Sequence, residues 1–326
     1  MPHDAMHQGL TSTTKLPKEA VIGGAARPSM QRTLFGVTTC SGIGVHSGEQ
    51  VTLKLMPAPE NTGIVFIRSD LTGDARMVPA RWDNVTDTRL CTIIANGRGG
   101  EVATIEHLMA ALHACGIDNA FIEISGREVP VMDGSSNPFV FLIDVAGSVE
   151  QSEPRRMIEV LKPVEVKRDG KYARLEPADD QSFSLDIDFN QGAIGQQKYD
   201  FTLTPESFKA EISRARTFGM RQEVDELRKH GLALGGSLDN SVVIDGDKVM
   251  NPEGLRYQDE PVRHKLLDAV GDLALAGSPI RGRFVGSRSG HAINNELLRA
   301  LFADPTAWRL IESAELAEPL VENLAS

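Results

Sequence analysis

The order of strand-like and helix-like segments repeats once along this chain of 326 residues. In each half, several alternating apolar runs come before the main helix-like segments, and a polar stretch at 147–156 separates the halves as a candidate linker. Runs of strands followed by helices are typical of α+β domains. We therefore predict two α+β domains, 31–150 and 155–318, between a flexible N-terminal leader at 1–30 and a frayed tail at 319–326.

The individual elements follow from their periodicity. Strands are predicted at 33–38, 50–57, 63–68, 89–94, 120–124, 158–160, 164–166, 173–176, 183–189, 199–203, 242–244 and 284–286. Helices are predicted at 104–116, 138–145, 223–229, 262–273 and 294–302, with Thr104 able to cap the first of them and Gly116 able to end it. The glycine-rich segment 42–48 lies between two strands, so we predict a hairpin loop rather than a phosphate-binding turn, which needs a helix after it.

Composition narrows the class of protein. Hydrophobic residues make up 41% and charged residues 24% of the chain, as in soluble globular proteins. The net charge of -11 argues against a nucleic-acid partner. No apolar run is long enough for a membrane-spanning helix, so we expect no stable membrane insertion. The cysteines Cys40, Cys91 and Cys115 form no C-x-x-C pair, which fits a reducing cytoplasm and argues against a disulfide framework or a thiolate zinc site.

The predicted helix 262–273 carries the first candidate site. His264 and Asp268 are four residues apart and lie on one helix face, where an imidazole and a carboxylate can bind one metal ion. For an isolated pair of this kind, a salt-bridged helix surface is the commoner interpretation. Asp272 continues the row as a possible further ligand, and Lys265 adds a cation beside it. A metal site here requires a ligand from elsewhere in the chain.

Three other segments offer partners for that helix. Glu106 and His107 are adjacent, and a glutamate beside a ligand histidine is a usual position for a general base. His291 follows a glycine and precedes the last helix, so a metal ligand, a general acid and a helix-capping residue are all open interpretations. Thr217 offers a hydroxyl on a loop.

Taken together and in order, these segments resemble the UDP-3-O-acyl-N-acetylglucosamine deacetylase family, the zinc amidases of lipid A biosynthesis. The resemblance runs from about residue 31 almost to the end of the chain, through 42–48, 104–108, 116–119, 131–135, 213–219, 234–237, 262–273 and 289–295. It implies two similar two-layer α/β domains, packed with helices between two sheets and with a zinc site at the domain interface.

The resemblance also implies the metal centre. His107, His264 and Asp268 match the zinc ligands of the family. Two imidazoles and one carboxylate leave a fourth position open, which is the signature of a catalytic rather than a structural zinc. Glu106 matches the general base. A two-histidine, one-aspartate site can also hold Fe(II), so the metal used in cells stays open.

Further residues receive roles from the same resemblance. His291 matches a protonated histidine that stabilises the oxyanion and acts as general acid, Asp272 matches the carboxylate that orients it, and Thr217 matches an oxyanion-binding hydroxyl. The predicted substrate-binding residues are Lys171, Phe189, Phe218, Gly236, Lys265 and Arg288. The family more often has lysine at the position of Arg288, a change that keeps the charge. Segment 224–243 resembles the family's inserted passage for the acyl chain, although without the resemblance an ordinary packed helix and strand would be the better interpretation.

The resulting hypothesis is a zinc-dependent deacetylase that converts UDP-3-O-acyl-N-acetylglucosamine to UDP-3-O-acyl-glucosamine and acetate. We expect a cytoplasmic monomer that makes at most transient contact with the inner membrane, and the preferred acyl chain length stays open. The alternative is a nucleotide- or lipid-binding module with a structural metal, which would need a fourth protein ligand. A metal-independent acyl or phosphoryl transferase is disfavoured because the chain lacks a P-loop and a G-x-S-x-G motif.

Overall fold

The computed structural model describes residues 29–189 and 192–313. The predicted leader, apart from residues 29–30, and the predicted tail lie outside the described residues. Among the described residues, no helix is long and apolar enough to cross a membrane.

The first sheet contains five strands in the order β2-β3-β9-β4-β5. These are β2 (Thr38–Ile43), β3 (Gln50–Pro57), β9 (Ala120–Ile124), β4 (Ile64–Arg68) and β5 (Met77–Pro79). In β3, Val51, Leu53 and Leu55 are buried while the residues between them are more exposed, so the alternation in sequence becomes one apolar face. Strand β9 pairs antiparallel with β3 and parallel with β4, which puts it in the middle of the sheet.

Smaller elements complete this part of the chain. A three-stranded sheet contains β6 (Val85–Asp87), β7 (Ile93–Ala95) and β8 (Glu101–Val102), and the helices are α1 (Glu106–Ala114) and α2 (Asn137–Ala146). Single 3-10 turns occur at η1 (Gly73–Ala75) and η2 (Trp82–Asn84). A two-stranded ribbon pairs β1 (Met30–Leu34) with β10 (Ser148–Pro154).

The second large sheet contains seven strands and is built around β19. Its strands are β11 (Arg156–Val160), β12 (Val164–Arg168), β13 (Lys171–Glu176), β14 (Gln181–Asp188), β15 (Gln196–Thr202), β19 (Ile280–Ser287) and β20 (Trp308–Glu312). The helices are α3 (Pro205–Ser207), the π-helical turn η3 (Phe208–Ile212), α5 (Glu260–Ala274) and α6 (His291–Ala303). A separate small unit joins β16 (Phe218–Met220), β17 (Val242–Asp245) and β18 (Lys248–Val249) to α4 (Arg221–Lys229).

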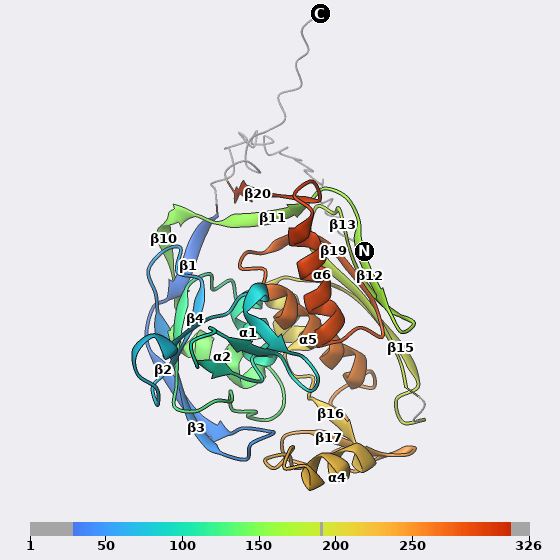
Figure 1. The fold of residues 1–326 in the computed structure, drawn as a ribbon. Coiled ribbons are helices and arrows are strands. Elements are labelled where there is room, and N and C mark those ends of the chain that lie inside the picture. Colours follow the sequence, from blue (N-terminus) through green and yellow to red (C-terminus); the bar gives the residue numbers. More distant parts are fainter. Residues whose placement is uncertain (1–28, 190–191, 314–326) are drawn as a thin grey trace, which may run out of the picture.

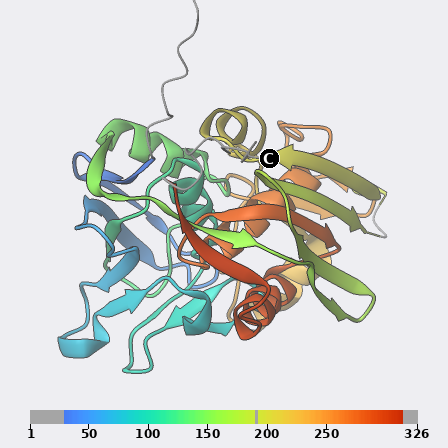
Figure 2. The same ribbon diagram turned by 90° about the horizontal axis from the view of Figure 1, so that it is seen from above.

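The helices form a layer between the two large sheets. Figure 1 shows α1, α2, α5 and α6 in the middle, with the blue strands of the first sheet on one side and the green and orange strands of the second on the other. Figure 2, viewed from above, shows β11 and β20 running together across the molecule. One hydrophobic cluster includes side chains from both parts of the chain, among them Leu108 on α1 and Leu266 on α5. The predicted α+β class is confirmed, while the domain boundaries stay a prediction.

Helices α1 and α5 approach each other unusually closely at Gly271. A Cβ atom at this position would overlap the main-chain carbonyl of Glu106 at the start of α1. Glycine within a helix costs roughly 1 kcal/mol relative to alanine, so its presence in α5 is explained by this close approach. As a result, the first turn of α1 lies directly against the middle of α5.

Most predicted elements are confirmed, but several details are wrong. The predicted strand 33–38 is the end of β1 and the first residue of β2, separated by a bend, and the predicted strand 89–94 begins only at Ile93. The candidate linker 147–156 forms β10 and the start of β11. Strand β20 was not predicted, and α6 begins at His291 rather than after it.

The expected cap of α1 is also wrong. Thr104 has a left-handed backbone with φ of 58°, and Ile105 occupies the N-cap position. The Thr104 hydroxyl donates instead to the Glu128 carboxylate at 3.0 Å. Gly116 has φ of 72°, so the predicted left-handed residue after this helix is confirmed.

Candidate metal centre and active site

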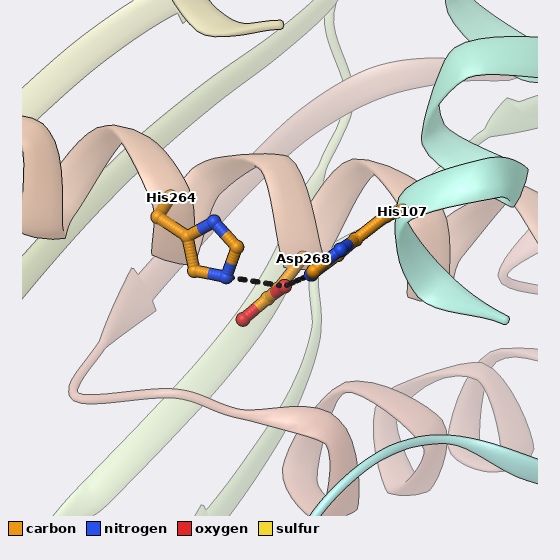
Figure 3. Close-up of side chains that lie close together, drawn as sticks. All are labelled: His107, His264 and Asp268. Carbon is orange, nitrogen blue, oxygen red and sulfur yellow. Dashed lines mark ion pairs between the residues drawn. The ribbon is translucent and has the colours of Figure 1, made fainter. Parts of the chain in front are cut away.

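Three potential metal ligands meet where α1 lies against α5. His107 comes from the first turn of α1, and His264 and Asp268 lie one turn apart on α5 (Figure 3). One ligand atom from each lies within 4.8 Å of the others. The Oδ1 atom of Asp268 is 3.6 Å from His107 Nε2 and 3.4 Å from His264 Nε2. The pair proposed from the spacing of α5 therefore gains its third member from the first half of the chain.

The chemistry of these donors fits a cation. Asp268 Oδ1 is buried and has no hydrogen-bond partner in the described structure, which is costly for a carboxylate oxygen. His264 Nδ1 lies 3.0 Å from the carbonyl oxygen of Ala215, an acceptor that fixes the proton on Nδ1 and leaves the Nε2 lone pair free. Burial lowers the pKa of His264 to about 3, so its imidazole is neutral, as a metal ligand requires.

A cation on the outer side of the group completes its electrostatics. Lys265 Nζ lies 2.9 Å from Asp268 Oδ2, the oxygen that does not face the histidines. Burial opposes the charge on Asp268, but the Lys265 ammonium holds the pKa of Asp268 well below its usual range. The carboxylate is thus ionised, with one oxygen bound to lysine and the other free for a metal.

A second polar cluster, Glu106, His291, Asp272 and Thr92, adjoins the metal ligands. His291 Nδ1 lies 2.9 Å from Asp272 Oδ2, and His291 Nε2 lies 3.7 Å from Glu106 Oε1. The Thr92 hydroxyl donates to Asp272 Oδ1 at 2.7 Å, and the Thr92 amide donates to Glu106 Oε2 at 3.1 Å. These four contacts close a ring, which we call the acid–base ring.

Two members of this ring have displaced pKa values. Burial raises the pKa of Glu106, which makes this carboxylate a better proton acceptor. Burial alone would lower the pKa of His291, but the carboxylates of Asp272 and Glu106 raise it to about 10. The ring therefore combines a buried carboxylate base with a cationic imidazole, as general acid–base catalysis requires.

Two cavities meet at these clusters, because Leu90, Lys265 and His291 line both. The first cavity, of about 530 Å³, includes Glu106 and the three metal ligands and extends along an apolar wall of α4 and the small sheet. Its apolar side chains include Val224, Leu227, Leu238, Val243 and Met250. The second cavity, of about 630 Å³, has the cations Arg89, Arg168, Lys171, Lys265 and Arg288 along its wall, beside the acidic Asp169 and Asp188.

The predicted substrate residues divide between these cavities. Thr217, Phe218 and Gly236 line the first. Lys171, Phe189 and Arg288 line the second. Lys265 was expected to face the substrate, and it lines both cavities, but its ammonium is paired with Asp268.

The loop 44–48 forms part of the wall of the first cavity. The Glu128 carboxylate accepts hydrogen bonds from the amides of His46 and Ser47, each at 2.9 Å. The amides of Leu234 and Gly235 bond to carbonyls of the same loop. The predicted hairpin loop is confirmed, and its contacts join the first half of the chain to the segment 224–243.

Comparison with known proteins agrees with this geometry. The family model described as UDP-3-O-acyl N-acetylglycosamine deacetylase matches residues 31–303. The chain belongs to this family. A UDP-3-O-acyl-N-acetylglucosamine deacetylase of Neisseria meningitidis serogroup C / serotype 2a is 49% identical over 289 residues, which cover 88% of this chain and 94% of the relative. Proteins with the same description from Phenylobacterium zucineum and Shewanella oneidensis are 48% and 46% identical, over 88% of this chain and 99% and 94% of their own lengths.

Three residues of this site received no role from the sequence alone. Thr92 lies in an apolar, strand-like run, where a threonine is ordinary, and Asn294, whose amide donates to Asp272 Oδ2 at 2.9 Å, is a polar residue in the predicted last helix. Gly271 carried the only usable signal, because a glycine inside a helical pattern suggests close packing.

Proposed function

We propose that this chain is a zinc-dependent deacetylase. It hydrolyses the N-acetyl amide of UDP-3-O-acyl-N-acetylglucosamine to give UDP-3-O-acyl-glucosamine and acetate, the committed step of lipid A biosynthesis. The observation that carries the proposal is the unpaired Asp268 oxygen facing His107 and His264, next to the acid–base ring. Relatives described by this activity, at up to 49% identity over 88% of the chain, support it.

His107, His264 and Asp268 would hold the zinc ion through two nitrogens and one oxygen. When bound, zinc supplies a Lewis acid that polarises the amide carbonyl and makes water acidic enough to attack near neutral pH. Two histidines and a carboxylate leave a coordination position free, which is the arrangement of catalytic zinc sites. The Ala215 carbonyl keeps the His264 ring in the orientation and tautomer that coordination needs.

Glu106 serves as the general base. It takes a proton from the water that attacks the acetyl carbonyl carbon, and its raised pKa suits proton acceptance near neutral pH. The Thr92 amide holds one carboxylate oxygen of Glu106, which leaves the other oxygen on the side of His291. Attack forms the new C–O bond and converts the carbonyl to a tetrahedral oxyanion, which the Thr217 hydroxyl binds.

His291 serves as the general acid. Its charge, maintained by Asp272, stabilises the oxyanion, and it then donates a proton to the amide nitrogen as the C–N bond breaks. The leaving group departs as a neutral 2-amino sugar, and the acetyl group departs as acetate. Glu106 and His291 thus carry one proton each in opposite directions.

The two cavities suit the two ends of the substrate. Lys171 and Arg288 lie in the cationic second cavity, which fits a UDP diphosphate, with Phe189 beside them. Phe218 and Gly236 lie in the first cavity, whose apolar wall fits the acyl chain. Lys265 lines both and lies where the sugar would join them.

A deacetylation assay with metal analysis tests the proposal. We expect one zinc per chain, acetate release from the acylated UDP-sugar, loss of activity with a strong chelator and recovery when zinc is returned. Glu106→Gln should retain zinc while kcat falls by roughly 10²–10⁴-fold. Full activity in metal-free protein would overturn the proposal. Unfolding on metal removal, together with unchanged function in Glu106→Gln, would instead support a binding module with a structural metal.

We also expect the enzyme to act as a cytoplasmic monomer with transient contact to the inner membrane. The reason is chemical, because a UDP-sugar is water-soluble whereas its acyl chain favours a lipid surface. Cell fractionation and analytical ultracentrifugation test the two parts separately. A stable membrane-bound pool or a stable dimer would contradict them.

A further inference from the structure

Thr92 contacts both carboxylates of the acid–base ring with two different groups. It lies immediately before β7 and is buried, with 1% of its surface exposed. Its main-chain amide donates to Glu106 Oε2 at 3.1 Å, and its hydroxyl donates to Asp272 Oδ1 at 2.7 Å. Glu106 lies on α1 and Asp272 on α5, so this single residue bridges carboxylates from two helices.

The two carboxylates depend on Thr92 to different degrees. Within the described residues, the Thr92 amide is the only hydrogen-bond donor to the Glu106 side chain. Asp272 also accepts from Asn294 and pairs with His291, so the hydroxyl is one of three partners. The β-branched side chain of threonine has few rotamers, which keeps its hydroxyl aimed at Asp272.

We propose that Thr92 is a positioning residue that aligns the Glu106 base and the His291 acid with each other. This inference rests on the proposed deacetylase activity. The main-chain amide sets the direction of Glu106, and the side-chain hydroxyl sets the direction of Asp272 and hence of His291. Thr92 thereby fixes the position of the proton acceptor, Glu106, relative to the proton donor, His291.

Because the two contacts use different groups, they can be separated by mutation. Thr92→Val removes the hydroxyl but keeps the shape of the side chain and the amide bond to Glu106. The charged groups facing His291 are Glu106 from α1 and Asp268 and Asp272 from α5, with Lys265 beside Asp268. With one donor to Asp272 removed, more of its negative charge acts on His291, and the alkaline limb of the pH–rate profile should move to higher pH.

The experiment compares zinc-loaded wild type with Thr92→Val, Thr92→Ser and a matched control, Thr33→Val. Thr33 is also a buried threonine; it lies on β1 and lines neither cavity. Its hydroxyl donates to the Asn119 carbonyl at 2.7 Å. We expect kcat of Thr92→Val to fall by roughly 10–100-fold with little change in KM, as for other partners of active-site ligands. Thr92→Ser should restore most of the activity, and Thr33→Val should lose stability without any shift of the pH limbs.

A proton NMR measurement gives a readout that does not depend on turnover. The His291 Nδ1 proton bonded to Asp272 should give a low-field resonance that moves in Thr92→Val and not in Thr33→Val. Wild-type kcat and pH limbs in Thr92→Val would overturn the inference. So would a loss shared equally by Thr92→Ser, with unmoved limbs and an unmoved resonance, because that pattern indicates only a structural role. If wild type itself releases no acetate, the deacetylase proposal fails, and the resonance alone then decides whether Thr92 orients the His291–Asp272 pair.

Discussion

The metal ligands and the acid–base ring both include residues of α1 and α5, yet the histidines in the two clusters have opposite pKa shifts. Burial lowers the pKa of His264 to about 3, whereas Asp272 and Glu106 raise the pKa of His291 to about 10. The imidazoles of His264 and His291 are both enclosed, and both lie near carboxylates. The contrast lies in the charges around each imidazole. His264 faces one carboxylate, Asp268, which His107 and Lys265 oppose, whereas His291 faces the carboxylates of Asp272, Glu106 and Asp268.

Among the described residues, no lysine or arginine forms an ion pair with Asp272. Its partners are Thr92, Asn294 and His291, and the first two are neutral donors that leave the carboxylate charge available to the imidazole. One lysine side chain thus helps to keep His264, the proposed ligand, neutral, while His291, the proposed proton donor, is cationic. Distance acts in the same direction, because Asp272 is hydrogen-bonded to His291 at 2.9 Å while Asp268 Oδ1 lies 3.4 Å from His264. The two histidines therefore differ both in how close their carboxylates lie and in what else those carboxylates contact.

Removing a proposed metal ligand should have the largest effect, because it disables the metal cluster and leaves the acid–base ring in place. His264→Ala deletes one of the two imidazoles that face Asp268. Because bound zinc is worth several kcal/mol of transition-state stabilisation, we expect kcat/KM to fall by about three orders of magnitude or more. Metal content measured by mass spectrometry should fall in parallel. His230→Ala removes an exposed histidine at the end of α4 and is the matched control; equal losses in both variants would contradict the assignment.

Adding a single methyl group at Gly271 should disturb the metal ligands and the acid–base ring together. Gly271→Ala adds a methyl group where the Glu106 carbonyl lies, so α1 and α5 must separate. Overpacking of this kind costs about 1–3 kcal/mol of stability. A shift of about 1 Å at reacting groups can cost roughly a hundredfold in rate. Thermal unfolding and kcat/KM measure the two effects, and an unchanged Tm together with unchanged activity would show that the helices tolerate the methyl group.

The sequence predicts the elements well because each large sheet has one apolar face. Strands such as β3 therefore alternate between apolar and polar residues. It misses β20, and it misses the bend that separates β1 from β2, because these features depend on tertiary partners. Strand β20 exists through its pairing with β11, and that pairing brings together residues more than a hundred positions apart.

The candidate site shows the same division between local and distant information. The spacing of His264 and Asp268 indicates a possible metal pair, but the residues alone left His107 and His291 both open as the third ligand, and the resemblance to the family chose His107. The role of Thr92 follows from contacts to Glu106, 14 positions away, and to Asp272, 180 positions away. The pairing of Lys265 with Asp268, by contrast, is local, because the two residues lie three positions apart on α5.

Asp272→Asn should make the pKa of His291 more like that of His264, because it removes a carboxylate charge beside His291. The wild-type His291 pKa is raised, so the protonated, active form persists through neutral pH and is lost as pH rises through about 10. Loss of the carboxylate charge lowers that pKa, and the alkaline limb should move to lower pH while kcat falls by roughly 10–100-fold. The stability from the ion pair, present in full below the ordinary histidine pKa and lost as pH rises through about 10, should also disappear. Rate profiles and urea unfolding across this range measure both, and an unmoved alkaline limb would show that Asp272 does not set the charge of His291.

The smallest effect is expected at a cation of the second cavity that belongs to neither cluster. Arg288 lines this cavity, and its guanidinium donates to the Gly170 carbonyl at 2.6 Å. Arg288→Ala removes one cation facing the proposed diphosphate, so KM should rise by about tenfold, near the value of one charge-assisted hydrogen bond, with kcat nearly unchanged. Arg288→Lys keeps the charge and should change KM much less. Arg283→Ala, an exposed arginine on β19 outside both cavities, is the control. A fall in kcat rather than a rise in KM would mean that Arg288 acts on the acid–base ring. It would contradict the assignment of Arg288 to substrate binding alone.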